Sequence, residues 1–155
     1  MTPLELQKSL CREIEEISKD IILYGKDGTV KKLKAFPQRL PLKSKEDTES
    51  KYPFCIVRLE NGKKASDDSA YEVTTHLIIG IHHDNRDAQG HQELMIIINR
   101  ILERFFKNNV LANQYVMIDN FEWAIEDDDG SHPYYVGGIA LTWIVPSIVK
   151  EDVYS

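Results

Sequence analysis

The pattern of apolar and polar positions changes period once, between Tyr71 and Phe106. Alternate positions from 71 to 82 are apolar or threonine, which predicts one long β-strand. A polar turn follows at 83–87. Apolar residues then recur three and four positions apart, which predicts a helix over 88–107 with one buried face. The residues of that face are Leu94, Ile97, Ile98, Ile101, Leu102 and Phe105.

The N-terminal segment predicts a first helix over residues 3–22. Thr2 and Glu5 have the spacing of a capping box, with Pro3 at the first helical position. Five apolar residues then fall on one helical face: Leu6, Leu10, Ile14, Ile17 and Ile21. The turn residues Gly25, Asp27 and Gly28 predict the end of this helix.

Further short apolar runs predict the remaining strands. Residues 29–36, with three lysines, indicate an exposed sheet edge, and residues 54–59 indicate a central strand that is apolar on both faces. Asn61-Gly62 predicts a turn, so that 61–70 form the long charged tip of a hairpin that leads to the 71–82 strand. Late strands are expected at 115–118 and 121–125, or as one bent strand, and at 138–145.

Polar stretches interrupt these elements. Residues 42–51 are almost wholly polar and predict a mobile loop, which is either a solvated linker or a segment that orders on a partner. Residues 127–130 predict a turn.

The order of elements predicts an α+β fold: a mainly antiparallel β-sheet with two α-helices packed on one side. The chain has 155 residues, and we expect a single domain over 1–147 with a loose C-terminal tail at 148–155.

Composition narrows the function classes. The chain is 42% hydrophobic and carries a net charge of -6, which favours a globular protein and argues against a general nucleic-acid binder. The start of the chain lacks the apolar run of a signal peptide, and no apolar run approaches the roughly 20 residues that span a bilayer. We therefore expect synthesis and action in a cytoplasm, with Cys11 and Cys55 as reduced thiols or, in an oxidising compartment, as a disulfide.

Candidate chemistry is sparse. His76 and His82 share a strand face but lie about 20 Å apart, too far for one metal ion. A weak metal site at His82, Asp84 and His91 is one reading, and polar residues around a turn are the other. The acidic run 126–130 lacks the alternation of a calcium loop. We expect no catalytic residues, no enzymatic activity and no cofactor.

Several motifs, taken in order, resemble the tail-terminator (tail-completion) proteins of long-tailed bacteriophages and prophages. They are Tyr52-Pro53-Phe54 at the start of a strand, the 71–81 strand, Asp87-Ala88-Gln89-Gly90 before the amphipathic helix, His132-Pro133-Tyr134-Tyr135, and the run from Gly138 through Trp143 to Pro146. The resemblance covers roughly residues 1–147.

This resemblance implies an α+β structural protein of the virion without catalytic activity. It implies a ring, usually a hexamer, at the head-proximal end of the tail tube, where it stops tube polymerisation and provides the surface for head–tail joining. The implied partners are further copies of the chain, the tail-tube protein and a head-connector or neck protein. DNA would only pass through the channel, and no membrane is involved. The implied location is the tail, and the host bacterial cytoplasm during assembly.

The residues themselves suggest where such contacts lie. The charged tip supplies Lys63, Lys64, Asp67 and Asp68, and the aromatic pair Tyr134 and Tyr135 completes the candidate subunit or tube interface. Trp123 and Trp143 are further candidate anchors, with ordinary core packing as the alternative for Trp143. The 71–81 strand is expected to offer an open edge to a neighbouring subunit. A small cytoplasmic enzyme or ligand-binding domain with an unrecognised site is the alternative function.

Overall fold

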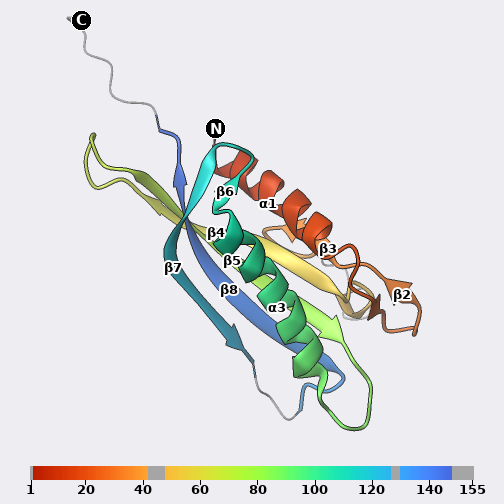
Figure 1. Cartoon of the computed structure of the whole chain (residues 1–155). Helices are drawn as coiled ribbons and strands as arrows, with labels where there is room; N and C mark the ends of the chain where they lie inside the picture. Colours follow the sequence, from red (N-terminus) through yellow and green to blue (C-terminus); the bar gives the residue numbers. More distant parts are fainter. Residues whose placement is uncertain (1, 42–47, 127–129, 148–155) are drawn as a thin grey trace, which may run out of the picture.

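A curled six-stranded sheet and two long helices on one of its faces make up most of the structure (Figure 1). The computed structural model describes residues 2–41, 48–126 and 130–147. The larger part of the expected loop (42–47), the larger part of the expected turn (127–129 of 127–130) and the tail at 148–155 lie outside these residues. Within the described part of the expected loop, Thr48 and Glu49 are helical.

The main sheet has the strand order β3-β4-β5-β8-β7-β6. Its strands are β3 (Lys34–Pro37), β4 (Phe54–Lys63), β5 (Tyr71–His82), β8 (Tyr134–Val145), β7 (Tyr115–Ile125) and β6 (Val110–Leu111). Only β3 and β4 pair in parallel, and the other neighbours are antiparallel. The predicted α+β fold with a mainly antiparallel sheet is therefore confirmed. A separate hairpin joins β1 (Leu23–Tyr24) to β2 (Val30–Lys31).

The first helix, α1 (Pro3–Ile17), begins as the sequence predicts. The Thr2 hydroxyl accepts a hydrogen bond from the Glu5 backbone N–H at 3.2 Å, and the Glu5 carboxylate accepts one from the Thr2 N–H at 3.1 Å. The helix ends at Ile17, not at residue 22. Ser18 caps this end: its backbone N–H and its hydroxyl both donate to the Ile14 carbonyl, at 3.1 Å and 2.8 Å.

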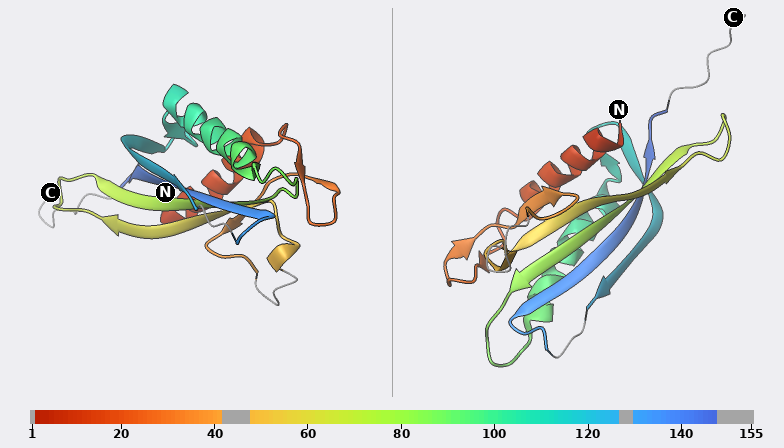
Figure 2. Two further views of the ribbon diagram at one scale, coloured as in Figure 1. Left: turned by 90° about the horizontal axis from the view of Figure 1, so that it is seen from below. Right: turned by 180° about the vertical axis from the view of Figure 1, so that it is seen from behind.

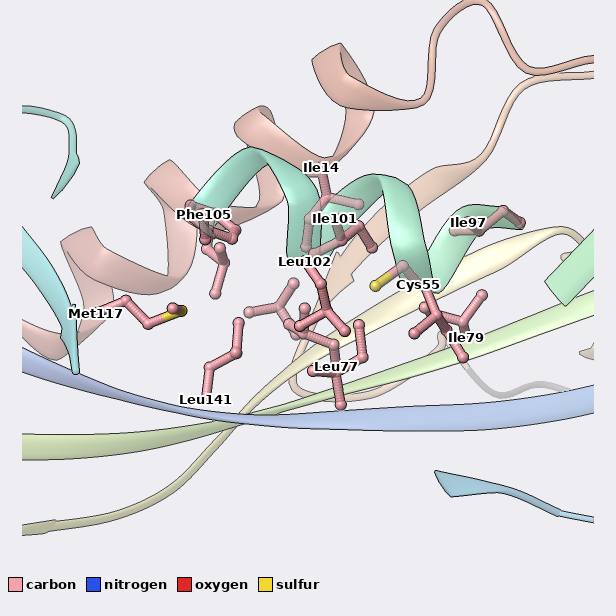
Figure 3. Close-up of a cluster of buried hydrophobic side chains, with 14 of the residues drawn as sticks. Ile14, Cys55, Leu77, Ile79, Ile97, Ile101, Leu102, Phe105, Met117 and Leu141 are labelled. Atoms are coloured by element: carbon pink, nitrogen blue, oxygen red, sulfur yellow. The ribbon is translucent and has the colours of Figure 1, made fainter. Parts of the chain in front are cut away.

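The second long helix, α3 (Gly90–Lys107), lies over β5 and β8 with the predicted apolar face inward (Figure 3). Its six apolar residues are all buried, and Ile101 and Phe105 are fully inaccessible to solvent. Two ion pairs fix α3 against the N-terminal segment: Arg104 contacts Glu13 of α1 at 2.6 Å, and Arg100 contacts Asp20 just after α1 at 2.8 Å. The main core is thus a single layer between the helices and the sheet.

The opposite sheet face is covered only in part. Phe36, Leu40, Phe54 and Ile56 form a small second apolar cluster there, against which Tyr52 and Ile78 pack. Figure 2 shows, from behind, that both long helices lie on the other side of the sheet. One sheet face is therefore available to other molecules along part of its length.

The hairpin between β4 and β5 differs from its prediction. Asn61-Gly62 is not a turn: Asn61 and Gly62 continue β4 opposite Thr74 and Val73, after a bulge between Leu59 and Asn61. The bulge shifts the register by one residue, so the strands stay paired as far as Lys63. The 71–81 strand has no open edge, because β4 and β8 pair with it on both sides.

The other strand predictions need smaller changes. The single strand expected at 29–36 is divided between β2 and β3, of which β3 does lie at the margin of the main sheet. Of the two predictions for residues 115–125, one bent strand is correct. β7 is a single strand, and its register against β8 shifts between Met117 and Phe121. The final strand begins at Tyr134, four residues before the predicted start.

Candidate functional site

The six candidate interface residues occupy opposite ends of the sheet. Lys63, Lys64, Asp67 and Asp68 belong to the β4–β5 hairpin, next to Tyr71 at the start of β5. Tyr134 pairs with His82 at the other end of the same strand. Eleven residue steps separate Tyr71 from His82, or roughly 36 Å of strand. The structure therefore divides these residues into two separate contact regions.

The turn end of the β4–β5 hairpin projects beyond the rest of the sheet (Figures 1 and 2). We call residues 60–70 of this hairpin the arm. Contacts within the arm are local. The Lys64 ammonium donates to the Asp67 carbonyl at 2.6 Å, and the hydroxyls of Ser66 and Ser69 lie 2.7 Å apart. Lys63, Asp67 and Asp68 are exposed. The arm contributes nothing to the buried core, so its surface is accessible to another molecule.

Tyr134 belongs to an aromatic group at the opposite end. Its ring centroid lies 4.6 Å from that of Tyr52 and 5.4 Å from that of His82. Tyr52 in turn contacts Phe54 edge-on at 4.7 Å. The rings of Phe54 and Tyr52 cover Gly80, where a Cβ would lie 2.5 Å from a Phe54 ring carbon. Burial raises the pKa of the Tyr52 phenol, and nearby Tyr134 adds to the shift.

Tyr135 points to the opposite, helical face. Its ring covers Gly90 at the start of α3, where it leaves no room for a Cβ. Its hydroxyl lies 2.8 Å from Nδ1 of His132. Tyr134 and Tyr135 are both half-buried, so each has a packing role inside the chain, and a role in an interface stays a prediction.

The two tryptophans differ in environment. Trp143 is fully buried; its indole N–H donates to the Thr75 hydroxyl at 3.0 Å, and its ring packs edge-on against Phe105 at 5.1 Å. Its interpretation as an interface anchor is wrong, and ordinary core packing is correct. Trp123 lies on β7 and is 46% exposed. The exposed Phe121 lies two residues before it on the same strand, with its ring 4.9 Å from that of Phe106 on α3.

These three aromatic residues, Phe106, Phe121 and Trp123, form what we call the aromatic strip. The three- and four-residue spacing of apolar positions predicts that Phe105 is buried, but it does not include Phe106. Phe106 is the next residue along the chain and lies on the flank of α3. Phe121 and Trp123 share the helical face of the sheet but lie beyond the cover of the helix. Residues 121, 123 and 125 are alternate apolar positions, so the sequence indicates that they share one face of a strand. It does not indicate that this strand lies at an exposed margin of the sheet.

β7 also has an open outer edge. β6 pairs only with Tyr115 and Val116, and the Met117 backbone is bonded to Asn109. From 118 to 125, no strand in the described residues lies on the outer side of β7. Unpaired strand edges are templates for further strands, so this edge, and not that of β5, is the candidate pairing site.

A polar hollow of about 660 Å³ lies between the β1–β2 hairpin and the start of α3. The His83 ring nitrogen Nδ1 lies 3.0 Å from a Glu93 carboxylate oxygen, and Nε2 lies 3.9 Å from Asp87. The structure therefore pairs His83 with carboxylates instead of joining His82, Asp84 and His91. Among the described residues, no group of three His, Cys, Asp or Glu side chains could hold a metal ion.

Both cysteines are free thiols, with Cys11 on α1 half-buried and Cys55 on β4 fully buried. Burial, with a smaller effect of the Glu15 carboxylate, raises the pKa of Cys11 from 9.0 to about 11. Burial also raises the pKa of Cys55. Neither thiol is suited to nucleophilic chemistry at neutral pH.

We expect these thiols to lower stability in alkali. Because its pKa is raised, the Cys11 thiol stays neutral in the folded state at pH values at which it ionises in the unfolded chain. The stability that this neutral thiol contributes is therefore complete below pH 9 and is lost by about pH 11. Urea unfolding at steps between pH 8 and 11 measures this loss. The Cys11→Ser variant should lose less stability over the interval, and an identical loss would contradict the assignment to Cys11.

The chain matches no known family model, and no curated protein is significantly similar to it. No helix in the described ranges is both long enough and apolar enough to cross a membrane.

Proposed function

We propose that this chain is a structural protein of a phage or prophage virion that forms a ring at the head-proximal end of the tail tube. There it stops tube polymerisation and presents the surface to which the head is joined. Its partners are further copies of the chain, the tail-tube protein and a head-connector or neck protein. It acts in the tail, after assembly in the host bacterial cytoplasm, and it is not an enzyme.

The observation that carries this proposal is the separation of two contact regions along one sheet. A protein that joins a tube to a head must contact different partners on opposite sides. The exposed arm lies at one end of β5 and the Tyr52–Tyr134 aromatic group at the other, roughly 36 Å away. The aromatic strip and the open β7 edge lie between them, on the flank where a neighbouring subunit would fit.

The charge of the chain supports a passive relation to DNA. Binding to duplex DNA depends on cationic groups that neutralise phosphates. The chain has a net charge of -6. A channel wall formed by its acidic residues, with the basic residues on other surfaces, offers DNA phosphates no cationic groups. DNA can then move through the ring without being held.

Deletion of the gene from its phage tests the proposal. We expect tubes of abnormal length and heads without tails, and wild-type copies supplied in trans should restore normal particles. Electron microscopy of the lysates measures both tube length and head attachment. Head-attached tails of normal length in the deletion strain would exclude this function.

The alternative is a small enzyme or ligand-binding domain that uses the hollow beside His83. The His83–Glu93 pair within a polar cavity favours it, since convergent polar groups in a hollow are typical of ligand sites. Substituting His83 by Ala leaves the arm and the β7 edge untouched. Normal tail completion by that variant, with folding intact, would show that the hollow has no part in tail joining.

A further inference from the structure

The β7 edge combines three features of a strand-binding surface. It has no outer neighbour from 118 to 125, it is flanked by the aromatic strip, and it carries two exposed acidic residues, Asp119 and Glu122. Within the described part of the chain, neither carboxylate forms an ion pair or a side-chain hydrogen bond. Charged side chains on a strand edge oppose its pairing with strands of other molecules in general. A strand that carries the opposite charge can still pair with it.

A second unpaired edge lies on the arm. β3 pairs with β4 only from Phe54 to Val57, and the Gln38 side chain then satisfies Leu59, accepting from its N–H at 3.0 Å. From residue 60 to Lys63, β4 has no neighbour on its outer side among the described strands. Opposite this segment, Glu72 to Thr75 of β5 also pair with β8, so residues 60–63 form the margin of a sheet of several strands. An unpaired margin of this kind can accept a further strand.

The arm edge ends in two basic residues, whereas the β7 edge is acidic. Lys63 is 3.8 Å from Glu72 in an exposed pair of small energetic value, and Lys64 donates to a backbone carbonyl of the arm. Both side chains can therefore turn to a new partner. Their ammonium groups suit the carboxylates of β7 and also the exposed face of Trp123, through cation–π attraction.

The β3 edge is a poorer partner for β7. The Ala35 N–H donates to the Glu15 carboxylate of α1 at 3.1 Å, and Pro37 has no N–H to offer. Pairing of two β7 edges would set Asp119 and Glu122 against the same residues of the second copy. Like charges in that position disfavour association.

The arm edge cannot pair with the β7 edge of its own chain. The outer side of β4 faces away from β5, and the outer side of β7 faces away from β8, so the two edges lie on opposite margins of one sheet. The arm also extends away from the sheet beyond Tyr71 (Figure 2). A strand partner for the arm edge therefore lies on another molecule.

We propose that the arm of one copy adds as a strand to the β7 edge of the next copy, with Lys63 and Lys64 against Asp119, Glu122 and Trp123. The contact uses different surfaces on the two copies, so repetition gives a closed ring when the rotation closes. The inference rests on the proposed function only in taking a second copy as the partner.

Cross-linking between two variants tests this contact in solution. One carries Ala65→Cys and the other Ala124→Cys, which are exposed positions with no charge to lose, and both carry Cys11→Ser, while the fully buried Cys55 is protected. Mixed and treated with a short bismaleimide, they should give a cross-linked heterodimer. A matched Lys8→Cys variant, which places the thiol on the exposed side of α1, should not cross-link to Ala124→Cys.

Charge reversal adds a second readout. Adding Asp119→Lys and Glu122→Lys to the Ala124→Cys copy should lower its cross-link to Ala65→Cys about ten-fold, because like charges then face each other.

A compensating change separates charge pairing from damage to the fold. The reversed β7 copy should regain its cross-link with an arm that carries Lys63→Glu, Lys64→Glu and, as the thiol, Ala65→Cys. The matched control arm carries Ala65→Cys alone and should cross-link poorly to the reversed copy.

Two results would overturn the proposal. One is a heterodimer of Ala65→Cys with Ala124→Cys that is no stronger than the Lys8→Cys control. The other is a dominant cross-link between two Ala124→Cys copies. The cross-link is measured on purified protein, independently of the phage deletion. If the cross-link is absent but the deletion gives the expected phenotype, this contact is refuted and the proposed function stands.

Discussion

Replacing Ile101 with Asp is expected to unfold most of the protein. Ile101 lies on α3 with no exposed surface, packed toward the sheet among residues such as Leu77 and Leu141 (Figure 3). A carboxylate there loses its hydration without gaining a partner, at a cost of several kcal/mol. Small domains are stable by only about 5–15 kcal/mol, so the loss is of the same order as the total.

Thermal and urea unfolding measure this effect, and Ile96→Asp provides the matched control. Ile96 lies on the same helix but is 54% exposed, so its substitution should change stability little. Equal melting temperatures for Ile101→Asp and the wild type would show that the apolar face of α3 does not form the core.

Reversing the charge of Asp67 and Asp68 in the arm is expected to leave folding intact and to impair assembly. Both residues are exposed and lie outside the core, so the Asp67→Lys and Asp68→Lys double variant should melt as the wild type does. Charges at the rim of a contact steer association and fix its register. The added ammonium groups would compete with Lys63 and Lys64 for the same acidic partners and permit a wrong register. We therefore expect the efficiency of head–tail joining to fall about ten-fold or more. The size of this defect should depend on salt concentration, because salt screens interactions between exposed charges.

The control for this variant makes the same change in net charge elsewhere. Glu16→Lys with Glu103→Lys reverses two exposed helical carboxylates and removes only surface ion pairs. Counting joined particles by electron microscopy compares the two. Wild-type efficiency in the arm variant would mean that the arm is a passive connector.

Elements with strong periodicity could be predicted from the chain alone. The alternation from Tyr71 to His82 and the three- and four-residue spacing of Leu94 to Phe105 predicted the long strand, the helix and its buried face, because burial of apolar area imposes those periods. The capping residues Thr2 and Glu5 likewise placed the start of α1, since their bonds are local. Local chemistry was sufficient for these elements but not for Asn61-Gly62, whose turn signal gave way to continued pairing of β4 with β5.

The exposure of edges and side chains followed only from the assembled fold. Strand order put β5 in the interior of the sheet and β7 near its margin, although both alternate in the same way along the sequence. The packing of α3 buried Trp143 and left Trp123 beyond the helix. Exposure depends on which segments pack side by side, and that long-range choice is not encoded in the residue period within one strand.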